Sequence, residues 1–170
     1  MIRVTLDTNT VNDDGLARIT AATAGHEVEC LWTTATEWEQ RGTPYARSGH
    51  ALVEAIAPFG FGPFGEGPFG GTPKGFKTSP GRFEEVLSII SAGGFPPPRS
   101  RSGLTSAQRR QFYDAMIFET HIGHERDAFV TDDEKAFIRH GRREALKALG
   151  QTRIMTVDEF CAWAAAGFPR

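Results

Sequence analysis

Four acidic side chains lie where predicted strands or helices meet turns, and they are the residues best placed to do chemistry. They are Asp7 after the first predicted strand, Glu37 after the second, Asp114 in a long helix and Asp133 after the third strand. Residues just past the carboxyl ends of parallel strands meet at one edge of the sheet, so Asp7 and Asp133 are expected close together. Clustered carboxylates repel unless a cation neutralises them. Hard divalent cations such as Mg²⁺ or Mn²⁺ prefer oxygen ligands and can activate water against a phosphate ester.

Strands and helices alternate along the chain, which predicts the scaffold for these acids. Alternating, β-branched segments predict strands at 2–6, 26–32, 128–130 and 153–155. Helical spacing, caps and terminal glycines predict helices at 14–23, 49–57, 83–91, 105–123, 133–140, 142–149 and 157–166. A further short helix carries Glu37 and is capped by Thr34 or Thr36. This order predicts an α/β fold with a parallel sheet and helices on both faces.

Residues 58–81 differ in composition from the rest of the chain. The segment holds eight Gly, five Pro and five Phe, and the tetrapeptide GPFG occurs twice. Such a composition excludes a regular helix or a central strand, and the segment is too long for an ordinary connection. We interpret it as an insertion in a single domain spanning residues 1–170. Its phenylalanines could tuck onto the body of the domain, bury against a partner protein or stack on unpaired bases.

Three short motifs, in this order, resemble those of the PIN-domain family of nucleases. They are Leu6-Asp7-Thr8-Asn9, Asp114-Ala115-Met116-Ile117 and Val130-Thr131-Asp132-Asp133. Glu37 matches the family's helix-borne acid after the second strand, and residues 153–164 look like the family's C-terminal end. The resemblance covers nearly the whole chain apart from about residues 58–100.

The resemblance implies a three-layer α/β/α sandwich with a central, mainly parallel sheet, and a metal-dependent endoribonuclease. The metal-binding and catalytic residues would be Asp7, Glu37, Asp114 and Asp133, with Mg²⁺ (or Mn²⁺) as cofactor. Thr8, Asn9 and Thr131 would hydrogen-bond to the ligands and orient them. Two doublets leave alternatives open, because Glu39 competes with Glu37 and Asp132 with Asp133.

Many small members of this family are toxins of bacterial toxin–antitoxin pairs, and they commonly dimerise. The resemblance therefore implies an RNA substrate, a possible antitoxin partner and a homodimer. The alternative within the same fold is a catalytically idle PIN-like module that binds RNA or protein. The acid set favours the enzyme, because a binding module gains nothing from clustered like charges.

Composition is that of an ordinary globular protein, with 39% hydrophobic and 24% charged residues. The net charge of −2 argues against RNA binding through bulk positive charge, although four arginines and no acid lie between residues 96 and 110. We expect Arg99, Arg101, Arg109 and Arg110 either to grip RNA phosphates or to form a solvated helix start. No apolar run approaches the roughly 18 residues of a membrane span. Cys30 and Cys161 read as core residues, which suits a cytoplasmic, reducing compartment.

Other classes of site fit less well. A phosphatase of the haloacid dehalogenase type would need a second acid at Asn9, and a dinucleotide-binding domain would need a Gly-rich turn after the first strand. His121 and His124 have a spacing that could suggest zinc, but no third ligand accompanies them. We therefore expect these histidines to lie on a polar helix surface.

Overall fold

A five-stranded sheet, with the order β3-β2-β1-β4-β5, forms the centre of the molecule. The computed structural model describes residues 1–33, 35–36, 51–53 and 79–169. All four strand pairs are parallel, so the predicted parallel α/β sheet is confirmed. The strands are β1 (Ile2–Leu6), β2 (Val28–Thr33), β3 (Ala51–Val53), β4 (Ala128–Val130) and β5 (Arg153–Met155).

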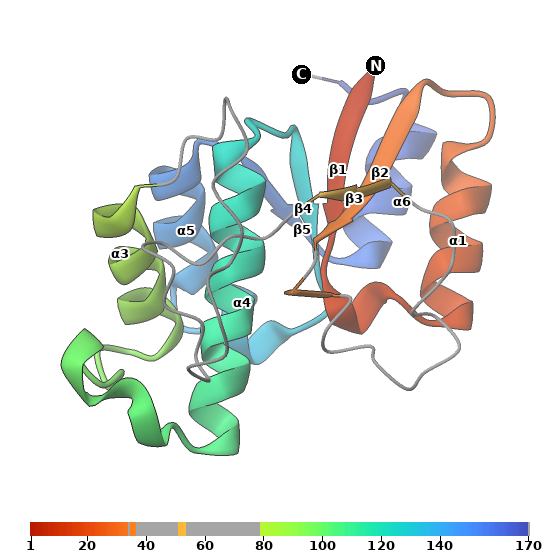
Figure 1. Ribbon diagram of the computed structural model, residues 1–170. Coiled ribbons are helices and arrows are strands. Elements are labelled where there is room, and N and C mark those ends of the chain that lie inside the picture. Colours follow the sequence, from red (N-terminus) through yellow and green to blue (C-terminus); the bar gives the residue numbers. More distant parts are fainter. Residues whose placement is uncertain (34, 37–50, 54–78, 170) are drawn as a thin grey trace.

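Helices cover both faces of this sheet and complete a three-layer α/β/α sandwich. On one side lie α3 (Pro80–Ile90), α4 (Ser106–Gly123) and α5 (Arg142–Gly150), and on the other lie α1 (Asp13–Thr23) and α6 (Val157–Ala165) (Figure 1). Each side has its own apolar cluster, one around Phe118 and Phe129 and the other around Val4, Leu6 and Trp163. The sheet is therefore buried on both faces, as a parallel sheet requires.

Helix boundaries follow local capping chemistry that the sequence displays. Thr105 and Thr156 each accept a hydrogen bond from the backbone N–H three residues on, and the side chains of Gln108 and Glu159 accept one from the backbone N–H of the cap. Ser79 caps α3, with Pro80 in its first turn. These caps satisfy N–H groups that a helix leaves unpaired at its start. The helices predicted at 14–23, 83–91, 105–123, 142–149 and 157–166 are confirmed to within a few residues.

Two predicted segments need correction. Residues 51–53 form strand β3 rather than part of a helix at 49–57, because Ala51–Val53 pairs with β2 and extends the sheet by one edge strand. Short apolar runs do not distinguish the two structures by periodicity alone, so the pairing decides. Pro80 and Gly81 belong to the first turn of α3 rather than to the insertion. Residues 58–78 of that insertion lie outside the described residues.

The short helix predicted at 133–140 is a five-residue π-type turn, η5 (Glu134–Ile138), capped by Asp133. The described residues also include 3₁₀ segments, among them η1 (Thr8–Thr10) after β1 and η4 (Pro98–Gly103) before α4. Cys30 and Cys161 are unpaired and half-buried against the α1/α6 core, as predicted, and burial raises the pKa of the Cys30 thiol to about 11. In the part of the chain that the structure describes, no helix is both long and apolar enough to cross a membrane.

His121 is fully buried between α4 and the sheet, so the expectation of a polar helix surface is wrong for this residue. Its Nδ1 lies 2.9 Å from Thr5 Oγ1 and its Nε2 lies 2.7 Å from Thr152 Oγ1. The hydroxyl of Thr152 donates to the carbonyl of Arg126, so Nε2 carries the proton and Nδ1 accepts one. Both ring nitrogens are thus engaged in holding α4 on the sheet. The partners lie 116 and 31 residues away along the chain, and no local pattern could reveal them.

Candidate metal centre at the carboxyl edge

Asp7 is a nearly buried carboxylate at the point where β1 ends, with 2% of its surface exposed. Its Oδ1 accepts a hydrogen bond from Thr8 N (2.9 Å), and its Oδ2 accepts one from Thr131 Oγ1 (2.6 Å). The Asp7 backbone also bonds to Val130 and Thr10, which fixes the turn. Hydrogen bonds from both sides hold the carboxylate in one orientation, as a metal ligand needs.

Thr131 is the link that brings the third motif to Asp7. Besides donating to Asp7, its hydroxyl accepts a hydrogen bond from Asp133 N (3.0 Å) and a longer one from Asn9 Nδ2 (3.4 Å). Asn9 Oδ1 in turn accepts from Asp132 N (3.0 Å). One network therefore joins the turns after β1 and β4, as the position of both at one sheet edge predicts.

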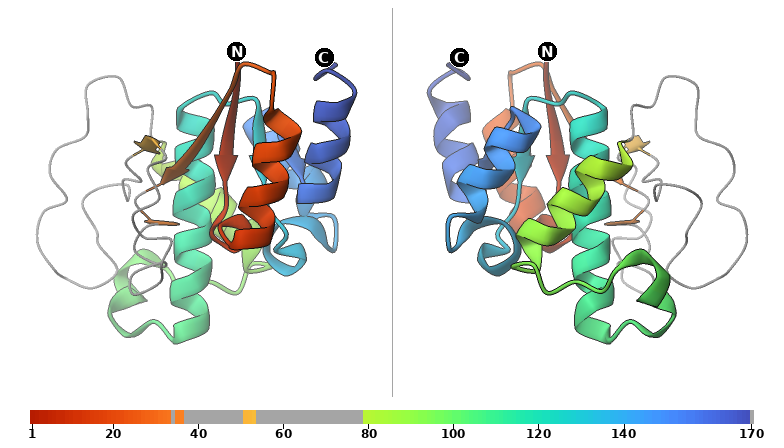
Figure 2. Two further views of the ribbon diagram at one scale, coloured as in Figure 1. Left: turned by 90° about the vertical axis from the view of Figure 1, so that its right-hand side faces the viewer. Right: turned by 90° about the vertical axis from the view of Figure 1, so that its left-hand side faces the viewer.

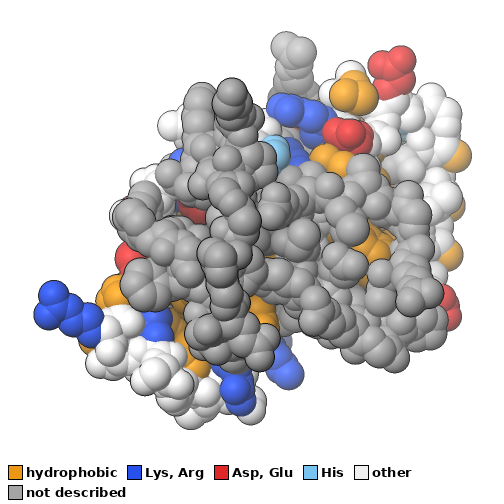
Figure 3. Space-filling model, viewed as in Figure 1, with side chains coloured by type: hydrophobic (Ala, Val, Ile, Leu, Met, Phe, Trp, Pro, Cys, Tyr) orange, Lys and Arg blue, Asp and Glu red, His pale blue; other side chains and the backbone are white. Residues whose placement is uncertain are grey.

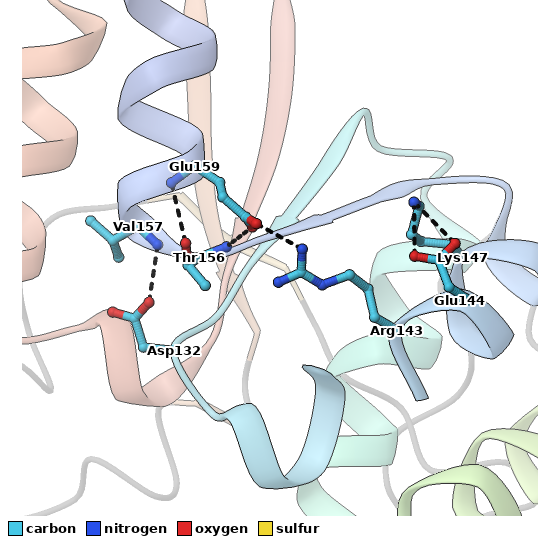
Figure 4. Close-up of polar contacts among 7 residues, drawn as sticks. All are labelled: Asp132, Arg143, Glu144, Lys147, Thr156, Val157 and Glu159. Carbon is cyan, nitrogen blue, oxygen red and sulfur yellow. Dashed lines mark hydrogen bonds and ion pairs between the residues drawn. The ribbon is translucent and has the colours of Figure 1, made fainter. Parts of the chain in front are cut away.

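The carboxylates of Asp132 and Asp133 accept hydrogen bonds from different helices. Asp132 Oδ1 accepts a hydrogen bond from Val157 N (3.0 Å), so this carboxylate is directed at the first turn of α6 (Figure 4). A negative charge there is favourable, because a helix N-terminus carries unpaired N–H groups and partial positive charge. Asp133 caps η5 by accepting from Ala136 N (2.8 Å) and shares the Thr131 network with Asp7. One oxygen of each carboxylate is thus a helix cap, and we favour Asp133 as the ligand because its backbone shares Thr131 with Asp7.

Asp114 lies on the face of α4 that packs against β1 and β4. His121, two turns later on this face, contacts Thr5 of β1, and Phe118 packs edge-to-face on Phe129 of β4 at 5.1 Å. Asp114 itself is 6% exposed. Side chains alternate along a strand, so Thr5 and Asp7 point to the α4 side while Val4 and Leu6 point to the α1/α6 core. Asp7 and Asp114 therefore lie on the same side of the sheet.

The level of Asp114 along α4 matches that of Asp7. The helix runs antiparallel to the strands, because it ends beside the start of β4, where Asp127 N bonds to Arg3 O of β1. Starting from the contact of His121 with Thr5, Asp114 lies seven residues back, or about 10 Å along the helix. Asp7 lies two residues on from Thr5, or about 7 Å along the strand. Both carboxylates thus reach the carboxyl edge of the sheet.

The fourth predicted acid, Glu37, and its competitor Glu39 lie outside the described residues. The segment that leads to them is anchored, because Thr33 at the end of β2 and Thr36 are fully buried and their hydroxyls lie 3.1 Å apart. Among the residues that the structure describes, no three His, Cys, Asp or Glu side chains are grouped as a metal site.

The side chains at this edge are of the kind that binds a hard cation. Asp7, Asp114 and Asp133 offer carboxylate oxygens; Thr131 bonds to Asp7 and to Asp133 N, and Asn9 bonds to Thr131 and to Asp132 N. Oxygen-only donors suit Mg²⁺ or Mn²⁺ better than zinc, which favours nitrogen and sulfur. Thr8 contacts Asp7 through its backbone N–H, which donates to Oδ1.

Of the arginines predicted to grip RNA, Arg101 is occupied within the fold. Its guanidinium binds both oxygens of Glu84 (2.9 and 2.6 Å) and lies over the rings of Phe95 and Phe112. Arg99, Arg109 and Arg110 are exposed. Basic side chains accordingly show along the lower margin of the molecule, over η4 and the start of α4 (Figure 3).

A hollow of about 860 Å³ lies at the opposite edge of the sheet, where β4 and β5 begin. Its lining includes Arg126, Lys147 and Gly150, near the C-terminal ends of α4 and α5. Cations at these positions offset the negative ends of the helix dipoles. The hollow is thus remote from the acids of the candidate metal centre. The positive charges of Arg126 and Lys147 are explained by the helix ends that they stabilise.

The fold and the acidic edge define a parallel α/β sandwich with carboxylates at the carboxyl ends of its strands. No protein-family model, no curated protein and no solved structure matches the chain.

Proposed function

We propose that this protein is a metal-dependent endoribonuclease that cleaves phosphodiester bonds in RNA. The observation that supports this most is the position of Asp7, a nearly buried carboxylate held by Thr131 beside Asp133, with Asp114 on the facing side of α4. Burying carboxylates together is costly unless a cation accompanies them. A site built to hold a cation accounts for that cost.

Each residue has a physical task in this proposal. Asp7, Glu37, Asp114 and Asp133 would hold Mg²⁺ or Mn²⁺, which when bound polarises a phosphate oxygen and makes a bound water more acidic. Thr131 fixes the Asp7 oxygen and, through its bond to Asp133 N, the start of η5. Asn9 ties the turn after β1 to the turn after β4, so the ligands keep their spacing.

The finer parts of the proposal rest on the resemblance to the PIN-domain family. We propose that the protein acts in the cytoplasm as the toxin of a toxin–antitoxin pair, and that it forms a homodimer. Mass measurement in solution and a search for a small neighbouring protein that inhibits cleavage test these two points separately.

The first prediction concerns metal dependence. Purified protein is expected to cut a labelled single-stranded or loop-containing RNA in the presence of Mg²⁺ or Mn²⁺, and EDTA is expected to stop cleavage. Restoring the metal is expected to restore activity, because hydrogen bonds from Thr8 N and Thr131 hold the Asp7 carboxylate without a metal. Gel analysis of the products measures this.

RNA binding without cleavage, under all metal conditions, would contradict this prediction. That result would favour the idle PIN-like binding module instead.

A further inference from the structure

The face of α4 that carries Asp114 continues past the end of the sheet. A helix advances about 100° per residue, so Arg110, four residues earlier, lies about 40° from Asp114 around the axis. His121 and Phe118 show that this face is the one directed at β1 and β4. Arg110 therefore lies one turn beyond Asp114 on the face that bears the acid.

The sheet does not reach Arg110, which explains why this residue is exposed while Asp114 is buried. The contact between His121 and Thr5 gives a common level on the helix and the strand. Arg110 lies eleven residues before His121, or about 16 Å along the helix. Strand β1 ends only one residue after Thr5, or about 3 Å along the strand. The first turns of α4 accordingly project beyond the strand ends (Figure 2). An elongated ligand passing the acidic edge would run beside this projecting turn.

The neighbouring arginines are placed differently. Arg109 is rotated by about 140° from Asp114, so it points away from the acidic edge although it is equally exposed. Arg101 is engaged with Glu84. In the described part of the chain no carboxylate forms an ion pair with Arg110, and the guanidinium is available to a phosphate.

We propose that Arg110 is a substrate-binding residue that contacts an RNA backbone phosphate adjacent to the one at the acidic edge. A guanidinium can bind two phosphate oxygens at once and remains charged at all working pH values. The contact places the chain against the acids without reading base identity. This inference rests on the proposed function for the identity of the ligand, because the acidic edge is where the scissile phosphate would lie.

The test compares Arg110→Gln with Arg109→Gln, each in an Asp7→Asn background that prevents cleavage. Both substitutions remove one charge from the same exposed turn and keep good helix formers. Affinity for a fluorescein-labelled single-stranded RNA is measured by anisotropy at several salt concentrations, with Mn²⁺ present. Loss of one phosphate contact lowers the slope of log K against log salt by about 0.7 and weakens binding about fivefold near 0.1 M salt.

Arg110→Gln is expected to show that loss, Arg109→Gln to stay within about twofold of its parent, and Arg110→Lys to keep the salt slope. Unchanged melting temperatures would exclude a general effect on the fold. Equal losses in the two Gln variants, no loss in Arg110→Gln, or no RNA binding at all would overturn the inference. If wild-type protein binds RNA through Arg110 but never cleaves it, the nuclease proposal fails while this inference stands.

Discussion

Asp7→Asn is expected to lower kcat/KM for RNA cleavage by about a thousandfold, the size of effect seen when a group that stabilises developing charge is removed. Asparagine has nearly the same shape: its amide oxygen can still accept from Thr8 N, and its amide nitrogen can donate to Thr131 Oγ1 in place of the bond that this hydroxyl donates to Asp7. The substitution removes the negative charge that a metal requires. The melting temperature should therefore stay the same or rise.

Asp132→Asn is the matched control for this substitution. Its side-chain oxygen can still accept from Val157 N, so α6 keeps its cap, and activity is expected to remain within about threefold of wild type. Asp133→Asn should instead resemble Asp7→Asn. Full activity in Asp7→Asn, or equal losses at residues 132 and 133, would contradict the assignment of ligands.

The second large effect concerns pH and the buried His121. Burial, and to a lesser degree the positive charge of Arg126 and then of His124, lowers the pKa of His121 from 6.5 to about 3. At pH values between these two pKa values, His121 is therefore protonated in the unfolded chain but neutral in the folded protein. The stability that neutral His121 contributes is fully present above pH 6.5 and is lost as pH falls, at close to 1.4 kcal/mol per pH unit below about pH 6.

Urea unfolding at pH 7 and pH 5 measures this effect. Wild-type protein is expected to lose about 2 kcal/mol more than His121→Gln over that interval, because glutamine has no proton to take up. His140→Gln, at an exposed position, should lose as much as wild type. The window lies above the range where most carboxylates titrate, and His124, whose pKa burial also lowers, is present in both proteins and cancels in the difference. An equal loss in wild type and His121→Gln would show that the imidazole titrates normally.

The sequence was sufficient to predict the parallel sheet and the place of Asp7 and Asp133 just past the ends of its strands. Alternation and helical spacing predict most elements, and the rule that strand ends share an edge predicts that Asp7 and Asp133 meet. In the structure the Thr131 hydroxyl joins the two strand ends, because it bonds both to Asp7 and to Asp133 N. Caps such as Thr105 and Thr156 are local, so they too can be read directly.

What could not be predicted depends on contacts between distant segments. Ala51–Val53 becomes a strand only because β2 offers it a pairing edge. His121 is buried because Thr5 and Thr152 supply partners for both ring nitrogens. The separate tasks of Asp132 and Asp133 follow from the approach of α6, which no spacing between the two acids reveals. Likewise, the difference between Arg109 and Arg110 appears only once the sheet-facing side of α4 is known.

Metal binding to the folded protein is the most direct test of a cation site at the carboxyl edge. The melting temperature at pH 7.5 is expected to rise with Mn²⁺. The free energy of unfolding should increase by about 2.7 kcal/mol when the Mn²⁺ concentration is one hundred times the dissociation constant. The gain should shrink as pH falls, because protons compete for the carboxylates. Asp7→Asn should lose the gain and Asp132→Asn should keep it. A wild-type protein indifferent to millimolar Mn²⁺ (roughly the upper range of such sites), or an equal gain in Asp7→Asn, would contradict the proposed metal centre.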